Sequence, residues 1–263
     1  MSVSSYLRGV SNSLYISRDS NEYESIDTSI GTIERRLNLY FDEEMERGVQ
    51  FGSSTRETML PRSADPNSDV DYMVIFTNEE DYKPQTFMDR LRSFANKYYS
   101  RSEIRQSHPT VVLELNHIMF DLVPAHKDFW SGLKIPAPNS DYKEWTSTDP
   151  KRFKKELTRL NKESGHILKR AIRLVKYWNA RKDRVYTSFD LEKSTARNTY
   201  LFADNIWKYF KKAMEALDKF GLPSYKKRKV RVAQDRIDDA KSALRNGNTA
   251  KAERKIRKVV PEL

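Results

Sequence analysis

The chain has 263 residues, of which 38% are hydrophobic and 32% charged, enough for one large domain or two smaller ones around a modest core. No apolar run approaches the roughly 18 residues that a membrane span requires, and the N-terminal segment lacks the apolar block of a signal peptide. The absence of cysteine excludes disulfides and thiolate metal sites. We therefore expect a cytoplasmic protein that has no membrane partner.

The formal net charge of +11 favours phosphate-rich partners such as nucleotides or nucleic acid. The excess is uneven, because the segment from Tyr225 to Leu263 holds 13 Lys and Arg against 5 Asp and Glu. Its densest part contains Lys226, Lys227, Arg228, Lys229 and Arg231. Two interpretations stay open: a solvated basic helix, or a surface that binds nucleic acid.

In the first half of the chain, hydrophobic periodicity predicts a long helix over residues 22–48. A turn at Gly52-Ser53-Ser54 and a strand from Val70 to Phe76 follow. An amphipathic helix over residues 85–99 comes next, and then a hairpin from Thr110 to Ala125 that turns at Asn116-His117.

From Asp149 the pattern becomes helical. It predicts one long helix over residues 149–182, a loop over residues 186–193, a helix from about Thr195 to Phe220, and a final pair, Gln234–Asn246 and Thr249–Lys258. This order predicts an α+β fold with two lobes. Residues 1–148 form a core lobe with a small mixed sheet and a long N-terminal helix, and residues 149–263 form a helical lobe. The active site is expected in the cleft between the lobes.

Asp69 and Asp71 are the first candidate site residues. Side chains two residues apart in a strand point to the same face, so these carboxylates project together. They repel each other unless a cation lies between them, and oxygen ligands suit Mg²⁺, which is usually completed by substrate phosphates. Gly52 allows the backbone to approach a phosphate closely, and the Ser53 hydroxyl can donate to it.

A third carboxylate is needed if two metals assist phosphoryl transfer. Asp121 is the natural candidate, because it lies among apolar residues on the second hairpin strand, and Glu114 on the partner strand is the alternative. A lone D-x-D or Gly-Ser is more often a turn or a cap than a site. The combination of Gly-Ser, D-x-D and a later strand aspartate is more specific.

These residues resemble the polymerase-β-like nucleotidyltransferase superfamily. Within it, the sequence is similar to the branch that contains oligoadenylate synthetase, cyclic GMP-AMP synthase and the bacterial CD-NTases, which are cyclic oligonucleotide synthases. Gly52-Ser53, the pair Asp69 and Asp71, and Asp121 within "FDLVPA" match the motifs of the superfamily. "LKRAIRLVKYWNAR", Leu168 to Arg181, and "YTSFDLEK", Tyr186 to Lys193, are similar to the helical-lobe motifs of the branch.

The resemblance implies further roles. Lys176 and Ser188 would contact the donor triphosphate, and Phe189 would stack on the donor base. Without the motif, a solvated Lys176 and a core Phe189 are the plainer interpretations. Two Mg²⁺ ions, for which Mn²⁺ can substitute, would be held by Asp69, Asp71 and Asp121. An acceptor hydroxyl would attack the α-phosphate of a nucleoside triphosphate, with ATP the expected donor and GTP or pyrimidine triphosphates the alternatives.

Three functions follow as hypotheses. The first is synthesis of a cyclic or linear oligonucleotide second messenger in bacterial antiphage signalling, with a downstream effector that the product activates. The second is a nucleotidyltransferase that modifies tRNA or protein, as a toxin does, which the basic C-terminal segment favours. The third is an inactive nucleic-acid-binding or scaffold homologue, against which the intact acidic triad argues.

Overall fold

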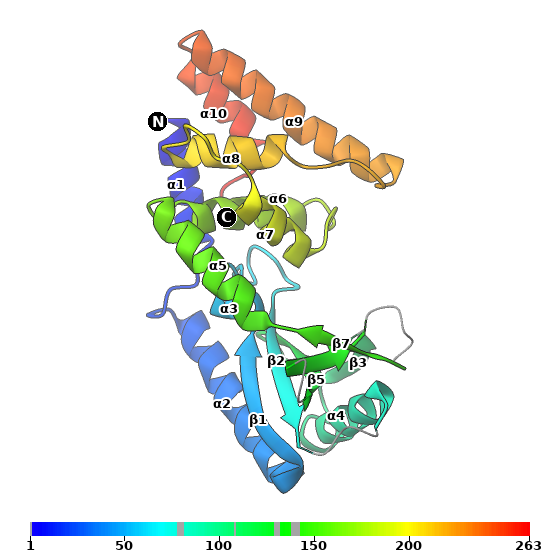
Figure 1. The fold of residues 1–263 in the computed structure, drawn as a ribbon. Helices are drawn as coiled ribbons and strands as arrows, with labels where there is room; N and C mark the ends of the chain where they lie inside the picture. The colour runs from blue at the N-terminus through cyan, green and yellow to red at the C-terminus, as the bar shows by residue number, and fades with distance from the viewer. Residues whose placement is uncertain (1, 78–81, 108, 129–131, 138–142) are drawn as a thin grey trace. The chain divides into compact units, whose positions relative to one another are not determined.

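The computed structural model describes residues 2–77, 82–107, 109–128, 132–137 and 143–263, and it divides into two compact units (Figure 1). Unit 1 consists of Met1–Ile16, Glu57–Pro66 and Glu156–Leu263, and unit 2 of Ser17–Arg56 and Asn67–Lys155. The sequence predicts a single boundary at 148/149. The structure changes unit nearby, at 155/156, and it also assigns the first 16 residues and a ten-residue segment near position 60 to the helical unit.

Unit 2 is the α+β part of the chain, and its described residues form a seven-stranded sheet. Its strands are β1 (Met45–Phe51), β2 (Asp69–Phe76), β3 (Glu103–Ser107), β4 (Thr110–Glu114), β5 (Met119–Asp128), β6 (Gly132–Pro136) and β7 (Trp145–Thr148). The order is β1-β2-β5-β4-β3, and β6 pairs with β5 and β7. Strands β2 and β5 are parallel, whereas all other pairs are antiparallel. The sheet is therefore mixed, as predicted.

Helices α2 (Asn21–Phe41) and α4 (Pro84–Tyr98) cover one face of this sheet. The ring of Phe76 on β2 lies between them, with its centroid 5.1 Å from that of Phe41 and 4.8 Å from that of Phe87. Because side chains alternate along a strand, this face of β2 is buried. The opposite face carries Asp69 and Asp71 at one end of the strand and apolar residues at the other.

The predicted helix over residues 22–48 is wrong at its C-terminal end. Helix α2 stops at Phe41, a short 3₁₀ turn covers Asp42–Glu44, and strand β1 begins at Met45. Val49 and Phe51 pack against the apolar end of the acid-bearing face, an arrangement that no helical periodicity shows. The predicted strand over 70–76, the helix over 85–99 and the hairpin are confirmed. The hairpin closes with a 2.9 Å bond from the Leu115 amide to the Ile118 carbonyl.

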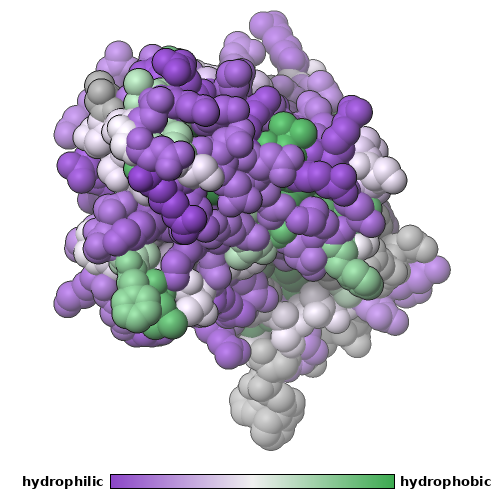
Figure 2. All heavy atoms as spheres, turned by 90° about the horizontal axis from the view of Figure 1, so that it is seen from above, coloured by the Kyte–Doolittle hydropathy of each residue, from purple (hydrophilic) through white to green (hydrophobic). Residues whose placement is uncertain are grey.

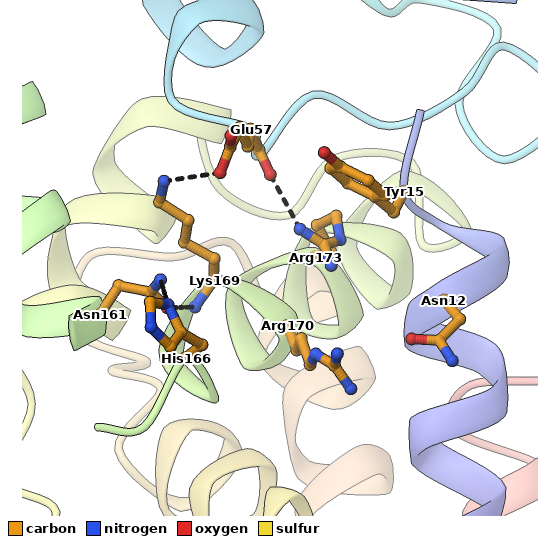
Figure 3. A pocket seen from close by; sticks show the side chains of 8 residues that line it. All are labelled: Asn12, Tyr15, Glu57, Asn161, His166, Lys169, Arg170 and Arg173. Carbon is orange, nitrogen blue, oxygen red and sulfur yellow. Dashed lines mark hydrogen bonds and ion pairs between the residues drawn. The ribbon is translucent and has the colours of Figure 1, made fainter. Parts of the chain in front are cut away.

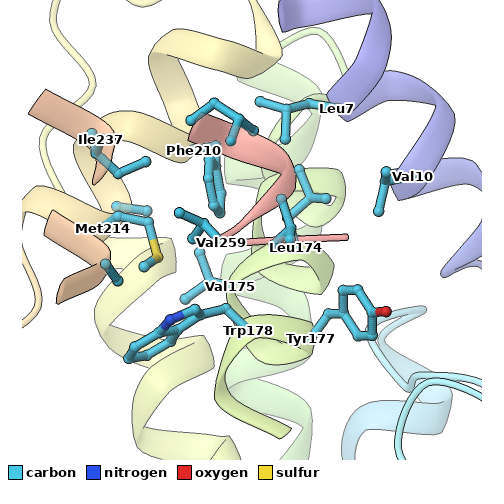
Figure 4. Packing of buried hydrophobic residues seen from close by; sticks show 14 of the residues in the cluster. Leu7, Val10, Leu174, Val175, Tyr177, Trp178, Phe210, Met214, Ile237 and Val259 are labelled. Carbon is cyan, nitrogen blue, oxygen red and sulfur yellow. The ribbon is translucent and has the colours of Figure 1, made fainter. Parts of the chain in front are cut away.

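Unit 1 is helical. It contains α1 (Val3–Ser13), most of α5 (Pro150–Glu163), α6 (Leu168–Ala180), α7 (Ser188–Arg197), α8 (Ile206–Glu215), α9 (Ser224–Arg245) and α10 (Thr249–Arg257). One hydrophobic core joins the helices other than α5, with side chains from α1, α6, α8, α9 and the C-terminal segment (Figure 4). Leu7, Trp178, Phe210 and Ile237 are fully buried in it. The two ends of the chain therefore belong to the same core.

Two predicted helices and one predicted loop in this unit have the wrong boundaries. The helix predicted over 149–182 is two helices, because Gly165 and His166 both adopt positive φ, 60° and 64°, and end α5. The loop predicted over 186–193 is largely the start of α7, capped by the Thr187 hydroxyl. The helix predicted from 195 to 220 is interrupted between α7 and α8, where Phe202 has φ 60°. The final break at Asn246-Gly247-Asn248 is confirmed, although α9 begins at Ser224.

The outer face shown in Figure 2 is mainly hydrophilic, with small, separate hydrophobic patches. Within the described ranges of the chain, no helix combines the length and the apolar character needed to cross a bilayer.

Candidate active site

Strands β2 and β5 bring the three predicted acids to one place on the sheet. They pair in parallel with Asp71 opposite Asp121 and Asp69 opposite Met119. Because residues in register lie side by side and alternate residues share a face, Asp69, Asp71 and Asp121 all project from the same face. Residues fifty positions apart in the sequence thus become nearest neighbours.

The alternative acid, Glu114, also lies on this face but in the next row. It pairs with Met119 on β5 and with Glu103 on β3, whereas Asp121 pairs with Asp71 and with Val112. The register therefore favours Asp121 as the third acid of the site.

The three aspartates are half-exposed, while the residues that flank them on their strands are buried. Across the described residues, no three His, Cys, Asp or Glu side chains are close enough together to hold a metal ion as they stand. The donor chemistry nevertheless fits a hard divalent cation, because three carboxylates on one face offer only oxygen ligands. A divalent-metal site stays a prediction.

Gly52 lies directly against the acids, where β1 ends and the one-turn helix α3 (Gly52–Thr55) begins. Its φ is +71°, and a Cβ atom added there would lie 1.6 Å from Asp71 Oδ2. Any other residue would therefore be strained in its backbone and would collide with a site carboxylate. Since α3 starts at this point, Ser53 lies in its first turn, directly after the glycine that contacts Asp71.

Lys176 belongs to unit 1, where it lies on α6. It is 6% exposed, so a solvated surface lysine is excluded. Its Nζ donates a 2.8 Å hydrogen bond to the carbonyl oxygen of Thr58. Its ammonium is thus held against the backbone that follows the Gly-Ser turn.

Ser188 and Phe189 also belong to unit 1 and form the first turn of α7. The Thr187 side chain caps this helix by accepting a hydrogen bond from the Asp190 amide, which orients the turn. Phe189 is 48% exposed and is therefore not a core residue, so part of its ring is open to a ligand. The two units are compact on their own, and the grouping of these residues with the acids stays a prediction.

Sequence reasoning missed the role of the segment 57–66, which it treated as a mostly polar connection between Gly-Ser and Asp69. Three of its side chains bind other residues of unit 1. Glu57 forms an ion pair with Lys169 (2.9 Å), Thr58 donates a hydrogen bond to Glu192 (2.8 Å), and Asp65 forms an ion pair with Arg184 (2.8 Å). Leu60 is buried in the core of that unit. The apolar pair Met59-Leu60 within the polar stretch was the available signal.

Parallel strands that carry three acids beside a Gly-Ser turn, together with a helical unit, define the class of polymerase-β-like nucleotidyltransferases. Residues 1–161 match the model of the Second Messenger Oligonucleotide or Dinucleotide Synthetase domain. The chain belongs to this family.

One curated relative is a protein from Bacillus cereus (strain VD146) named as a probable cyclic nucleotide synthase. It is 25% identical over 217 residues, which cover 67% of this chain and 62% of that protein. The match thus spans less than two thirds of the relative.

Solved structures of CD-NTases share the fold over nearly the whole chain. CdnC from E. coli MS115-1, solved with ATP, has a TM-score of 0.71 at 14% identity and covers 100% of this chain and 98% of its own. DncV from Vibrio cholerae, with 3′-deoxy GTP, has a TM-score of 0.74 at 11% identity and covers 93% of this chain and 90% of its own. CdnG from Bradyrhizobium diazoefficiens, with GTP, has a TM-score of 0.70 at 10% identity and covers 98% of this chain and 98% of its own. The predicted two-lobed fold is confirmed.

Proposed function

We propose that the chain is a nucleotidyltransferase that joins nucleoside triphosphates into a cyclic or linear oligonucleotide second messenger and releases pyrophosphate. The observation that carries the proposal is the register of β2 and β5, which places Asp71 beside Asp121 and on the same face as Asp69. Membership of a family of second-messenger synthetases supports it, and so do solved relatives described with ATP or GTP.

In this proposal Asp69, Asp71 and Asp121 hold two divalent cations, Mg²⁺ or Mn²⁺. When bound, the cations lower the pKa of the attacking hydroxyl and offset the charge that develops on the departing pyrophosphate. Asp121 accepts the proton of the acceptor 2′- or 3′-hydroxyl as its oxygen attacks the α-phosphate. The bond from the α-phosphorus to the bridging oxygen breaks, and pyrophosphate leaves.

The remaining site residues bind and orient the donor nucleotide. Gly52 lets the backbone approach the triphosphate closely, and Ser53 donates a hydrogen bond to it. Lys176 and Ser188 contact the same phosphates, and Phe189 stacks on the base, a contact worth about 1–3 kcal/mol. The product would activate a downstream effector in antiphage signalling, in the cytoplasm.

A direct test is incubation of the purified protein with the four α-³²P-labelled nucleoside triphosphates and Mg²⁺, with and without tRNA. Products are identified by mass spectrometry, and an EDTA arm and the Asp71→Asn variant serve as controls. We expect small phosphatase-resistant oligonucleotides that disappear in both controls. Label on tRNA or on protein would instead favour a macromolecule-modifying enzyme, and absence of turnover an inactive homologue.

A further inference from the structure

Unit 1 contains a pocket that none of the proposed site residues lines. Its volume is about 270 Å³, and it lies between α1, the end of α5, the start of α6 and Glu57 (Figure 3). Lys169, Arg170 and Arg173 line it from α6, where Arg173 neighbours both of the others because residues three and four positions apart on a helix lie side by side. Glu57 is the one carboxylate among the lining residues, so three cations face one acid.

Arg173 is the cation at the base of the pocket and is 5% exposed. Its Nη1 donates a 2.8 Å hydrogen bond to the Glu57 carbonyl, its Nη2 lies 3.5 Å from the Ser11 carbonyl, and its guanidinium lies 5.0 Å from the centre of the Tyr15 ring. Its Nε is buried without a hydrogen-bond partner. An unsatisfied donor on a buried charged group is costly, so the Arg173 guanidinium has donor capacity that the protein around it does not use.

The surrounding charges make an anionic acceptor favourable. Burial, and then the charge of Arg170, lower the pKa of Arg173 to about 10 against smaller opposing effects of Tyr15 and Glu57, so the residue is still a cation at neutral pH. Lys169 is only 13% exposed and pairs with the Glu57 carboxylate, which leaves two cations of the three without a carboxylate among the lining residues.

The wall of the pocket is built from strained backbone. Glu57 has φ 61° and His166 has φ 64°, conformations that are uncommon for residues other than glycine. The bond from the His166 amide to the Asn161 carbonyl (2.8 Å), and the contact of their side chains (3.2 Å), fix the backbone at the break between α5 and α6. Backbone strain of this kind concentrates at functional sites.

We propose that this pocket binds a phosphate group of a small molecule, held by Arg170 and Arg173. A guanidinium pair provides the planar donors that phosphate oxygens accept. The volume lies just below the roughly 300–1,000 Å³ of sites for drug-sized ligands, which suits a phosphate or diphosphate group rather than a whole large ligand. The proposal does not depend on the proposed function, because these residues are separate from those assigned to the donor nucleotide.

The test uses the full chain in EDTA at low salt, with ¹⁵N-labelled arginine and pyrophosphate as the probe. The Arg173 Nε–H resonance is assigned by its loss in Arg173→Lys. We expect it to shift and saturate as pyrophosphate is added. Arg170→Gln should raise the dissociation constant for pyrophosphate about tenfold, the effect of removing one charged hydrogen bond. Arg228→Gln, an equal charge change at an exposed position on α9, should leave it unchanged.

Binding at the donor nucleotide site is distinguished by Ser188→Ala. If Ser188→Ala weakens pyrophosphate binding and Arg170→Gln does not, the anion occupies the donor site and the proposal fails. It fails equally if no saturable shift occurs. Should Arg173→Lys not fold, the rise in melting temperature with pyrophosphate, compared between wild type and Arg170→Gln, decides the question.

Discussion

Asp121 and Glu114 project from the same face of the sheet, but only Asp121 lies beside another site acid. We therefore expect Asp121→Ala to reduce the rate of product formation by several orders of magnitude, because removing a metal ligand impairs activation of the attacking hydroxyl. Glu114→Ala should cost far less. The rates of both variants are measured under saturating nucleotide and Mg²⁺, and the reverse ranking would show that Glu114 is the third ligand.

Asp69 and Asp71 should matter for turnover and not for folding. In Asp69→Asn with Asp71→Asn, we expect turnover to be abolished, while the melting temperature in metal-free buffer holds or rises because two like charges on one face are removed. In the proposed site the native acids hold the cation, so adding Mg²⁺ should raise the melting temperature of the wild type only. Wild-type activity in the double variant would refute the assignment.

Gly52 is constrained by both its backbone and its neighbour. We expect Gly52→Ala to lower activity strongly and to destabilise the fold by more than the roughly 1–2 kcal/mol of a left-handed alanine, because its Cβ would meet the Asp71 carboxylate. Gly31→Ala, in the interior of α2 with open space around the added atom, is the matched control and should stabilise by about 0.5–1 kcal/mol. Equal effects in thermal unfolding would contradict this reading.

At the scale of elements, two lysines of the basic segment at the start of α9 bind the loop before α7. Lys226 Nζ donates to the carbonyls of Arg184 and Val185 at 3.1 Å, and Lys229 pairs with Asp183 at 2.7 Å. The Lys229 ammonium lowers the pKa of Asp183, chiefly through their hydrogen bond. Two of the five cations of this segment therefore have partners within unit 1.

Replacing Lys226 and Lys229 by Ser should lower the melting temperature, since both tie α9 to the 182–185 loop. Replacing Lys227, Arg228 and Arg231 by Ser, which changes more charge, should leave it nearly unchanged because surface substitutions away from such contacts have small effects. Because the pKa of Asp183 is depressed, its pairing supports the fold above the ordinary aspartate pKa. That support is lost as the pH falls through the lowered value. A larger loss of melting temperature in the Lys227, Arg228 and Arg231 variant than in the Lys226 and Lys229 variant would contradict this prediction.

Binding of nucleic acid by this segment is tested separately. The structure shows two of its cations engaged within unit 1, so we expect long duplex RNA or DNA at about 0.15 M salt to leave the synthesis rate unchanged. Strong stimulation that is lost when all five cations become Ser would instead make the chain a nucleic-acid sensor.

At the scale of the whole molecule, Tyr6 joins the two ends of the chain within unit 1. It is 2% exposed, its hydroxyl donates a 2.8 Å hydrogen bond to the Val260 carbonyl, and the Arg257 guanidinium lies 4.3 Å from the centre of its ring. Tyr6→Phe should lower the free energy of unfolding by about 1 kcal/mol at neutral pH, because a buried hydrogen bond is lost.

The pH dependence of this variant follows from the same contact. Burial raises the pKa of Tyr6 to about 12, against an opposing effect of Arg257. The neutral phenol therefore contributes stability fully below its ordinary pKa of 10.0 and loses it as the pH rises through about 12. The gap between the melting temperatures of wild type and Tyr6→Phe should stay the same below pH 10.0 and shrink as the pH rises from there toward about 12. A gap that stays constant would show that Tyr6 does not titrate with unfolding.

The sequence alone was enough to predict a candidate acid site and the strands that carry it. Asp69 and Asp71 were predicted because two carboxylates on one strand face repel each other unless a cation lies between them. Asp121 was predicted because it lies among apolar residues on a later strand, and Gly52 because a close approach of the backbone to a phosphate needs glycine. The strand over 70–76, the helix over 85–99 and the hairpin followed from periodicities of 2 and 3.6 residues, which local backbone geometry imposes. These features depend on neighbours in the chain, so they are written in its local pattern.

Only the tertiary structure decided the features that depend on distant partners. Strand β1 forms because Val49 and Phe51 find Met73 and Ile75 across the sheet, and the α5–α6 break depends on positive φ at His166, which no periodicity signals. The choice of Asp121 over Glu114 needed the strand register, because both acids share one face and only the register puts Asp121 opposite Asp71 and Glu114 opposite Met119. The burial of Lys176 and Arg173 against the 57–66 segment likewise joins residues more than a hundred positions apart, a pairing that comes only from folding.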